Sequence, residues 1–302
     1  MDLSDLDLSD LVTEQRRPDL HDLDRRATVD LVALMAADQL SVADAVSTAA
    51  GDIAAAVDAV VGQLRRGGRL IYVGAGTAGR LGLLDAVECP PTFNTDQVVG
   101  LLAGGDGAST VSAEAVEDDA GCGAGDIRGL AVGPRDAVVG IAASGRTPYT
   151  LGAVDEARRR GAVTVGVSCN ADAELSGHVD HPIEVVVGPE FIAGSTRLKA
   201  GSAQKLVLNA LSTLAMVRLG KTFGDLMVDV RASNAKLRDR AGRIVGAATG
   251  ADGPAVDQAL SAAAGNVKTA IVMLLGDVPA AEAAGRLSAH DGFVRAAVED
   301  RA

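Results

Sequence analysis

The chain has 302 residues, of which 48% are hydrophobic and 23% are charged. This length predicts about two domains, and the composition is typical of a folded globular protein. The 28 Lys and Arg against 40 Asp and Glu give a net charge of -12, which disfavours contact with nucleic-acid phosphates. Aromatic residues make up only 2% of the chain, so there are few platforms on which bases could stack. We therefore expect no nucleic-acid partner.

The cysteines and the N-terminus bear on where in the cell the protein is expected. Cys89, Cys122 and Cys169 are scattered and odd in number, which predicts neither a disulfide framework nor a zinc knuckle. No apolar run approaches the roughly 20 residues that span a bilayer. Residues 1–5 are acidic, unlike the start of a secretory signal. We expect a cytoplasmic protein without a membrane partner.

Residues 1–26 are polar and acidic, with Leu at irregular intervals. Two interpretations of this segment remain open: an arm that orders on a partner, or a mobile tail. From Thr28 onward the pattern is helical, and apolar residues step by four and three positions over Ile53–Leu64. Gly67 and Gly68 then provide a stop for the helix.

Five short β-prone runs follow, with stretches of helical length between most of them. They are 70–73, 98–102, 137–141, 163–167 and 183–187. Apolar runs separated by helices favour a mainly parallel sheet in a three-layer α/β sandwich. A long apolar helix is expected over Ser202–Leu219, and only short Ala-rich helices are indicated later. The expected organisation is an N-terminal arm over 1–26, an α/β domain over 27–240 and a small helical domain over 241–302.

The first motif follows the first expected strand. Gly74–Arg80 reads Gly-Ala-Gly-Thr-Ala-Gly-Arg and matches the dinucleotide pattern G-x-G-x-x-G. The acid that should end the next strand is missing, since Asp96 comes before that strand. Glycines and amides at a helix N-terminus bind any phosphate, so this turn is a candidate phosphate site. A tight turn without a ligand is the alternative. The candidate ligands here are Gly76, Thr77, Gly79 and Arg80.

Two further clusters carry hydroxyls and cations. One follows the third strand and precedes Pro148, and the other precedes the long apolar helix. Loops at the carboxyl ends of parallel strands form one crevice, and hydroxyls without a Lys-bearing Walker loop suit a sugar phosphate. A grouping of cations in so acidic a chain would attract an anion. The candidates are Ser144, Gly145, Arg146, Thr147, Ser195, Thr196, Arg197, Lys199 and Lys205.

Carboxylates and histidines are the remaining candidates for catalytic or metal-binding residues. The helix that begins near Gly79 is expected to end before Pro90, which places Glu88 in its last turn. The negative end of the helix dipole there favours a protonated carboxyl, which suits a general acid. From its spacing alone, Glu117 lies in a solvated acidic helix face. His178 and His181 lack a third ligand, so loop histidines are favoured over a metal site.

Several segments resemble the N-acetylmuramic acid 6-phosphate etherases. They are Gly74–Arg80, Glu88–Thr92, Ala143–Tyr149, Gly194–Gly201 and Leu226–Val230 with Asn234. Their order and spacing hold from about Thr13 to the C-terminus. The resemblance implies the sugar isomerase (SIS) fold, a flavodoxin-like or Rossmann-like arrangement shared with the glucokinase regulatory protein. It also implies a lyase of cell-wall recycling that cleaves the D-lactyl ether of N-acetylmuramic acid 6-phosphate with water. N-acetylglucosamine 6-phosphate and D-lactate would be released by elimination and then hydration.

The resemblance also implies residue roles. The proton donor of the family falls on Glu88 and its second active-site glutamate on Glu117. The related regulatory protein uses the residue at Glu114 near its sugar. No metal or organic cofactor is implied, because the open-chain aldehyde acidifies the proton next to it. A homodimer with active sites near the subunit boundary is implied as well.

Three departures from the family pattern leave alternatives open. The family usually has Ser where Ala78 and Val87 stand, and its N-terminal block differs at Arg17. A lost neutral hydrogen bond costs about 0.5–1.5 kcal/mol, which would weaken a phosphate site without abolishing it. A non-catalytic sugar-phosphate regulator is therefore the second hypothesis, and an aldose–ketose isomerase is the third.

The long apolar helix predicts how subunits meet. Apolar residues occupy more than one stripe of Ser202–Leu219, and a sheet covers only one of them. A second subunit is the expected cover for the rest. Residues 195–205, and the N-terminal arm, would then approach the sugar site of the partner.

Overall fold

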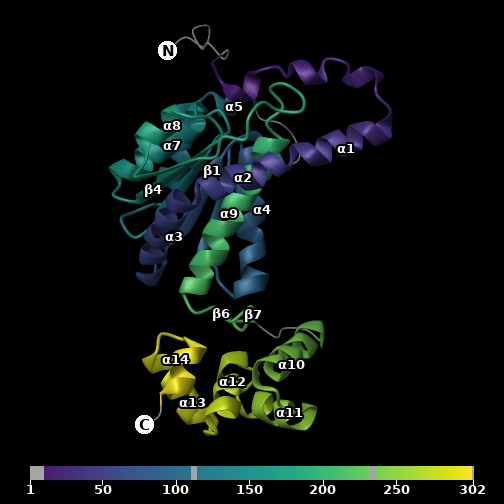
Figure 1. The fold of residues 1–302 in the computed structure, drawn as a ribbon. Helices are drawn as coiled ribbons and strands as arrows, with labels where there is room; N and C mark the ends of the chain where they lie inside the picture. The colour runs from purple at the N-terminus through teal and green to yellow at the C-terminus, as the bar shows by residue number, and fades with distance from the viewer. Residues whose placement is uncertain (1–9, 110–113, 231–234, 301–302) are drawn as a thin grey trace. The chain divides into compact units, whose positions relative to one another are not determined.

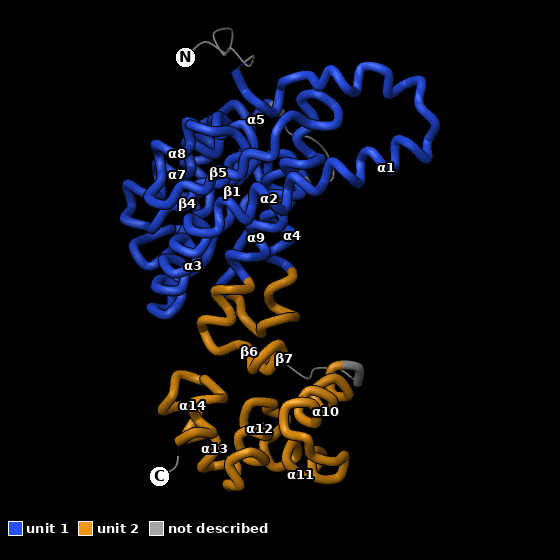
Figure 2. The backbone as a smooth tube through the Cα atoms, viewed as in Figure 1, with its two compact units in different colours: residues 1–87, 97–212 blue, residues 88–96, 213–302 orange. Residues whose placement is uncertain are grey.

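The computed structural model describes residues 10–109, 114–230 and 235–300. The chain divides into two compact units, residues 1–87 with 97–212 and residues 88–96 with 213–302 (Figure 2). Asn234, one of the residues that carry the resemblance, lies outside the described residues.

The first unit begins with an ordered N-terminal segment. Short 3₁₀ turns at Val12–Glu14, Pro18–Leu20 and Leu23–Arg25 lead into the helices. Leu11, Thr13 and Leu20 are buried, so this segment is anchored to its own unit at these three residues. The helices that follow are α1 (Thr28–Asp38), α2 (Leu40–Thr48) and α3 (Ala50–Arg65).

A five-stranded parallel sheet is the centre of this unit. Its strands are β1 (Leu70–Gly74), β2 (Val98–Leu102), β3 (Ala137–Ile141), β4 (Val163–Ser168) and β5 (His181–Glu184). The spatial order is β2-β1-β3-β4-β5, and every neighbouring pair is parallel. The predicted mainly parallel sheet is confirmed.

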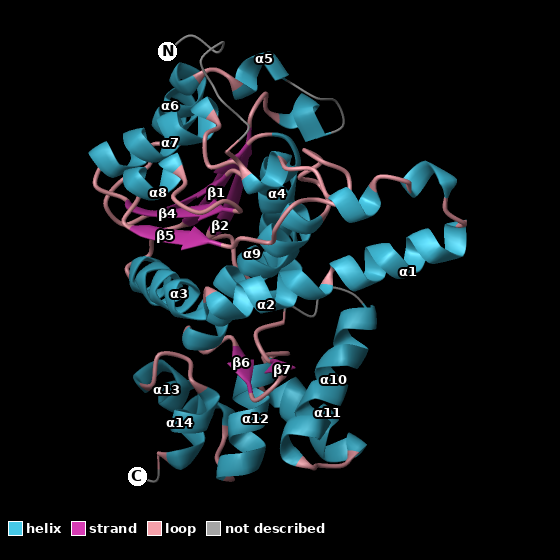
Figure 3. Cartoon of the chain, turned by 45° about the horizontal axis from the view of Figure 1, so that its top comes forward, coloured by secondary structure: helices cyan, strands magenta, loops and turns pink. Residues whose placement is uncertain are grey.

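Helices cover both faces of the sheet, as the predicted three-layer sandwich requires (Figures 1 and 3). Figure 3 shows α6 (Ala120–Gly129), α7 (Pro148–Arg159) and α8 (Glu174–His178) on one face and α3 on the other. Successive side chains of a strand point to opposite faces of the sheet. Ile71 and Val73 pack with Ile127 of α6 and Tyr149 of α7, whereas Tyr72 donates a hydrogen bond to the Leu208 carbonyl, 3.3 Å away, on the other face.

The bounds of one strand and the start of one helix differ from those predicted, and each difference has a physical reason. Of the predicted run 183–187, only residues 183 and 184 lie in β5, which begins two residues earlier. The strand ends there because its partner β4 ends at Ser168, which pairs with Glu184. The long helix α9 (Lys199–Arg218) begins three residues earlier than expected. Its first amides, those of Lys199 and Ala200, donate to the carboxylate of Glu190 at 2.9 Å, which caps the helix.

The prediction that a helix stops before the prolines is wrong. Helix α4 (Gly76–Phe93) contains Pro90 and Pro91. The backbone amide of Asn94 donates to the Pro90 carbonyl at 2.9 Å, so the helical turn closes after the prolines, and Asn94 then turns left-handed with φ 48°. Glu88 is therefore five residues from the helix end, and the dipole argument for a protonated acid loses its geometric basis.

The second unit is mainly helical, as predicted. A hairpin that the sequence patterns did not predict joins β6 (Thr222–Phe223) to β7 (Leu226–Met227). Five helices follow: α10 (Ala235–Thr249), α11 (Gly253–Ala262), α12 (Val267–Gly276), α13 (Ala280–Ala289) and α14 (Val294–Glu299). Val245, Ile271 and Ala283 lie in their shared core.

Within the described part of the chain, no single helix has both the length and the apolar character needed to cross a membrane. Two bent helix pairs, Thr28–Thr48 with Ala50–Arg65 and Gly253–Ala262 with Val267–Gly276, meet that test only when each pair is taken together. The cytoplasmic location stays a prediction.

Candidate active site

A cavity of about 450 Å³ lies in the first unit, where β1 and β3 end. These two strands are neighbours, yet the chain leaves them in opposite directions across the sheet, to β2 from one and to β4 from the other. Ligands of open α/β sheets bind at such a switch point, outside the carboxyl ends of the strands. The cavity therefore occupies the position where this architecture binds small molecules.

The turn from β1 into α4 forms one wall. Gly76, Thr77 and Ala78, in the first turn of α4, line the cavity. Gly79 does not line it. A Cβ on Gly79 would lie 2.3 Å from the Gly74 carbonyl oxygen, so this glycine permits the tight strand-to-helix packing. The first amides of a helix have no partner within the helix and are suited to bind a phosphate, and the residues of this turn line the cavity.

The loop after β3 forms the facing wall. Ser144, Arg146 and Thr147 line the cavity, and the Arg146 amide donates to the Ser144 Oγ at 3.2 Å. Gly145 serves the backbone instead, with φ 70°, and a Cβ there would lie 2.5 Å from the Cβ of Ala173. Two of the predicted hydroxyl-bearing loops therefore meet at one cavity.

Glu117 lines the cavity from α5 (Glu114–Glu117), and Asp118 lines it directly after that helix. A Cβ built on Gly76 would lie 3.9 Å from Oε2 of Glu117, so this carboxylate stands beside the first turn of α4. The interpretation of Glu117 as part of a solvated helix face is wrong, because the residue is half-buried at the cavity. Glu114 begins α5, and its side chain lies outside the described part of the structure.

The N-terminal segment contributes a wall that the sequence patterns did not predict. Leu11 and Glu14 line the cavity. The buried Thr13 between them holds the segment in place: its carbonyl accepts from the Gly194 amide at 3.0 Å, and its hydroxyl accepts from the Asn170 side chain at 3.2 Å. The signal was present in the N-terminal block of the family pattern, which includes Glu14.

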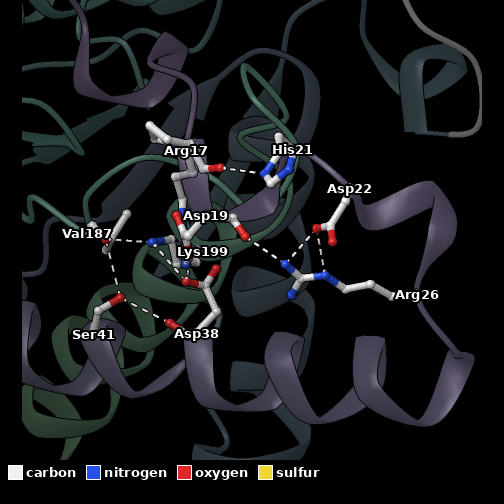
Figure 4. Close-up of polar contacts among 10 residues, drawn as sticks. Arg17, Asp19, His21, Asp22, Arg26, Asp38, Ser41, Val187 and Lys199 are labelled. Carbon is white, nitrogen blue, oxygen red and sulfur yellow. Dashed lines mark hydrogen bonds and ion pairs between the residues drawn. The ribbon is translucent and has the colours of Figure 1, made fainter.

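The candidate residues near the start of α9 fall into two groups, those that line the cavity and those that do not. Thr196 lines the cavity, whereas Ser195 and the exposed Arg197 do not. Lys199 is 3% exposed, and its Nζ donates to the Val187 carbonyl at 3.0 Å and lies 3.4 Å from Asp38. Figure 4 shows this lysine between Val187 and Asp38, where Arg17 also contacts Asp38. Lys199 ties the N-terminal helices to α9 and does not face the cavity.

Two further cations also point elsewhere. Lys205 contacts Asn209 one turn along α9, and Asn209 donates to the buried Asp85 at 2.6 Å. Burial raises the pKa of Asp85 above its usual range. Arg80 donates through Nε to the Ala108 carbonyl at 3.2 Å. Among the described residues, Arg146 is the one member of the predicted cation grouping that lines the cavity.

Glu88 belongs to the second unit, where it is exposed on α4. It is not among the residues that line the cavity. Val87, at the second position where the family usually has Ser, is 58% exposed, whereas Ala78, at the first, lines the cavity. The role of Glu88 stays a prediction from the resemblance.

Comparisons with known proteins agree with this fold. Residues 52–158 match the glucokinase regulatory protein N-terminal SIS domain, and residues 124–214 match the SIS domain. A phosphoheptose isomerase structure from Francisella tularensis covers 64% of this chain and 100% of its own, with a TM-score of 0.50 and 18% identity. A putative phosphosugar isomerase from Bacteroides fragilis covers 66% and 95%, with the same TM-score and identity. At this identity the two structures show the fold alone.

Relatives in sequence are much closer. The N-acetylmuramic acid 6-phosphate etherase of Rubrobacter xylanophilus is 62% identical over 293 residues, which cover 96% of this chain and 97% of that protein. The etherase of Streptomyces avermitilis is 56% identical over 97% of this chain and 94% of its own length. That of Erwinia tasmaniensis is 49% identical over 97% of both chains. Identity at this level over almost the whole length shows that this chain belongs to the N-acetylmuramic acid 6-phosphate etherase family.

Proposed function

We propose that this protein cleaves the D-lactyl ether of N-acetylmuramic acid 6-phosphate with water, giving N-acetylglucosamine 6-phosphate and D-lactate. One observation carries the proposal. The Glu117 carboxylate stands beside the first turn of α4, in a cavity at the β1–β3 switch point that Ser144 and Thr147 also line. The relatives with an etherase name span nearly the whole chain, so the proposal concerns the whole protein.

The phosphate is assigned to the first turn of α4 and the loop after β3. Unpaired amides at a helix N-terminus and the positive end of its dipole favour an anion. Four hydroxyl-bearing residues, Thr77, Ser144, Thr147 and Thr196, line the same cavity, and Arg146 adds a cation. Neutral donors together with one cation, as the described lining residues provide, suit a phosphate monoester.

The reaction needs a base and an acid. In the proposed first step, the Glu117 carboxylate removes the proton from the carbon next to the open-chain aldehyde. The electron pair forms a carbon–carbon double bond, the ether bond to lactate breaks, and Glu88 protonates the departing oxygen. Water then adds across the double bond. The position of Glu117 in the cavity supports its role, and the match of Glu88–Thr92 to the family motif supports the role of Glu88.

The active form is proposed to be a homodimer whose active sites lie near the subunit boundary. The N-terminal segment and Thr196 were expected to approach the sugar site of the partner, but Leu11, Glu14 and Thr196 line the cavity of their own chain. Uncovered apolar side chains support this assembly. On α1, Val29 is 74% exposed and Val32 is 64% exposed, and Leu40 at the start of α2 is 72% exposed. Leu206 on α9 is 44% exposed. Apolar surface of this kind marks protein interfaces.

The direct test is incubation of the purified chain with N-acetylmuramic acid 6-phosphate. We expect equal amounts of D-lactate and N-acetylglucosamine 6-phosphate to form. Binding of the sugar phosphate without release of lactate would indicate the regulator instead. Formation of a ketose phosphate would indicate the isomerase.

A further inference from the structure

Gln204 on α9 is a buried polar side chain without a partner. The residue is 1% exposed, and its Nε2 has no hydrogen-bond partner among the described residues. Two other buried side-chain atoms share this property there, Oδ2 of Asp38 and Oγ1 of Thr150. Only Gln204 of the three also lines the cavity. Since buried donors in native proteins are nearly always paired, this amide is the one whose missing partner would be a ligand.

The position of Gln204 relative to α4 follows from the preceding turn of α9. Gly201 and Gln204 are three residues apart, so they lie on the same face of the helix. A Cβ on Gly201 would lie 3.5 Å from Cγ2 of Thr77 and 4.0 Å from Cδ1 of Leu81. The face of α9 that bears Gln204 therefore packs against the first turns of α4, whose Thr77 lines the same cavity.

The polar groups near Gln204 on α9 are already engaged. Glu190 occupies the first amides of the helix, Lys199 donates to Val187, and Lys205 contacts Asn209. None of these side chains lines the cavity. On this side of the site, α9 thus presents a neutral amide donor rather than a cation.

We propose that Nε2 of Gln204 donates a hydrogen bond to a phosphate oxygen of the bound sugar phosphate, beside the first turn of α4. The inference rests on the proposed function and adds a phosphate-binding residue that sequence motifs did not indicate. The phosphate would then satisfy a buried donor that has no partner among the described residues.

The test uses the full chain and two variants with the same chemical change. Gln204→Met removes the donor and keeps the length of the side chain. Gln97→Met is the matched control, because Nε2 of Gln97 donates to the carbonyls of Leu64 at 3.0 Å and Gly68 at 2.8 Å, away from the cavity. Thermal unfolding is measured without ligand, and calorimetry measures binding of N-acetylglucosamine 6-phosphate and of N-acetylglucosamine.

The two variants should respond in opposite ways. Without ligand, Gln204→Met should unfold at the same temperature as the parent or higher, since an unsatisfied buried donor is removed. Its affinity for the phosphorylated sugar should fall about tenfold, the loss expected for one hydrogen bond to a charged group. Gln97→Met should unfold at a lower temperature and keep its affinity for the phosphorylated sugar.

An affinity of Gln204→Met within twofold of the parent would overturn the proposal. So would an equal loss for the phosphorylated and unphosphorylated sugars, which would assign the amide to the sugar ring. If Gln204→Met does not fold, Gln204→Glu decides, because a carboxylate beside the phosphate must weaken binding more than tenfold. These binding results do not require turnover, so a parent that binds the sugar phosphate but releases no D-lactate refutes the proposed function alone.

Discussion

At the scale of single residues, the carboxylate of Glu117 carries most of the proposed chemistry. It lines the cavity beside the first turn of α4. Glu117→Gln keeps the shape and removes the base, so D-lactate release should fall by about 10²–10⁴-fold. Binding of the sugar phosphate should change little. Glu174→Gln, an exposed position on α8, is the control and should keep full activity. If the Glu117→Gln variant kept a tenth of the parent rate, Glu117 would not be the base that removes the proton.

The role of Glu88 as the proton donor needs a separate test, because it is assigned from the family motif. If it protonates the departing lactate oxygen, Glu88→Gln should lower D-lactate release by about 10²–10⁴-fold and leave binding of the intact substrate in place. Steady-state rates and calorimetry on the same variant give both quantities. A rate within threefold of the parent would show that another group is the acid.

Which site residues could be predicted depended on where their partners lie in the chain. Thr77, Ser144 and Thr147 directly follow parallel strands, and the ends of such strands meet at one edge of a sheet, so their convergence could be predicted. Lys199 could not be placed this way. Its partner Asp38 is distant in sequence, and a cation in a motif looks the same whether it meets a ligand or an internal carboxylate. Gln204 carried no signal, because only the fold shows that its amide is unpaired.

At the scale of elements, strands buried on both faces were the most predictable features. Their continuous apolar runs distinguish them from the helices between them, and four of the five strands match the predicted runs to within one residue. The hairpin β6–β7 was not predicted, since strands of two residues each have no period to detect. The extension of α4 through Pro90 was not predicted, because prolines were expected to end the helix. That expectation did not consider the hydrogen bond from the Asn94 amide to the Pro90 carbonyl, which closes the last turn.

The contact between α6 and α7 depends on two glycines. A Cβ on Gly152 would lie 2.1 Å from the Ala120 carbonyl oxygen, and one on Gly123 would lie 2.0 Å from that of Tyr149. Gly152→Ala should therefore lower the free energy of unfolding by about 3 kcal/mol, the upper range for overpacking. Gly129→Ala at the end of α6 has open space around it and should be neutral or stabilising. Urea unfolding compares the two, and equal stability would contradict this account of the packing.

The hairpin of the second unit is tied to α12 by Asp229. Lys221 lies 2.8 Å and Lys268 3.1 Å from this carboxylate. Burial raises the pKa of Asp229, but the hydrogen bond from Lys221 and the charges of both lysines outweigh it, so the pKa is lowered overall. Its contribution to stability is then present above the ordinary aspartate pKa and is lost as the pH falls through the lowered value.

Asp229→Asn tests this tie. The substitution should lower the free energy of unfolding at pH 7 by about 1–3 kcal/mol, because two charged partners lose their carboxylate. The difference from the parent should shrink as the pH falls below the ordinary aspartate pKa of 3.8, and it should vanish only below the lowered pKa, where the parent carboxylate is protonated as well. A difference that is the same at pH 7 and pH 3 would show that packing, rather than charge, explains the loss.

At the scale of the whole molecule, the proposed dimer predicts a mass in solution. Light scattering at micromolar concentration should give about twice the chain mass of 30.4 kDa. Val32→Asp places a charge on the uncovered apolar face of α1 and should shift the protein towards the monomer. Ala55→Asp, at an exposed position of α3, is the control and should leave the mass unchanged. A fully active monomeric parent would contradict the assembly and leave the apolar face of α1 unexplained.

The central claim is that the cavity between the turn into α4 and the loop after β3 recognises a sugar by its phosphate. Calorimetry on the Glu117→Gln variant tests this most directly, because the intact substrate can be titrated without turnover. N-acetylmuramic acid 6-phosphate should bind, and unphosphorylated N-acetylmuramic acid should bind about 100-fold more weakly or not at all, since the donors at the helix N-terminus and the loop hydroxyls stay unpaired. Comparable affinity for the two sugars would contradict the assignment of this cavity.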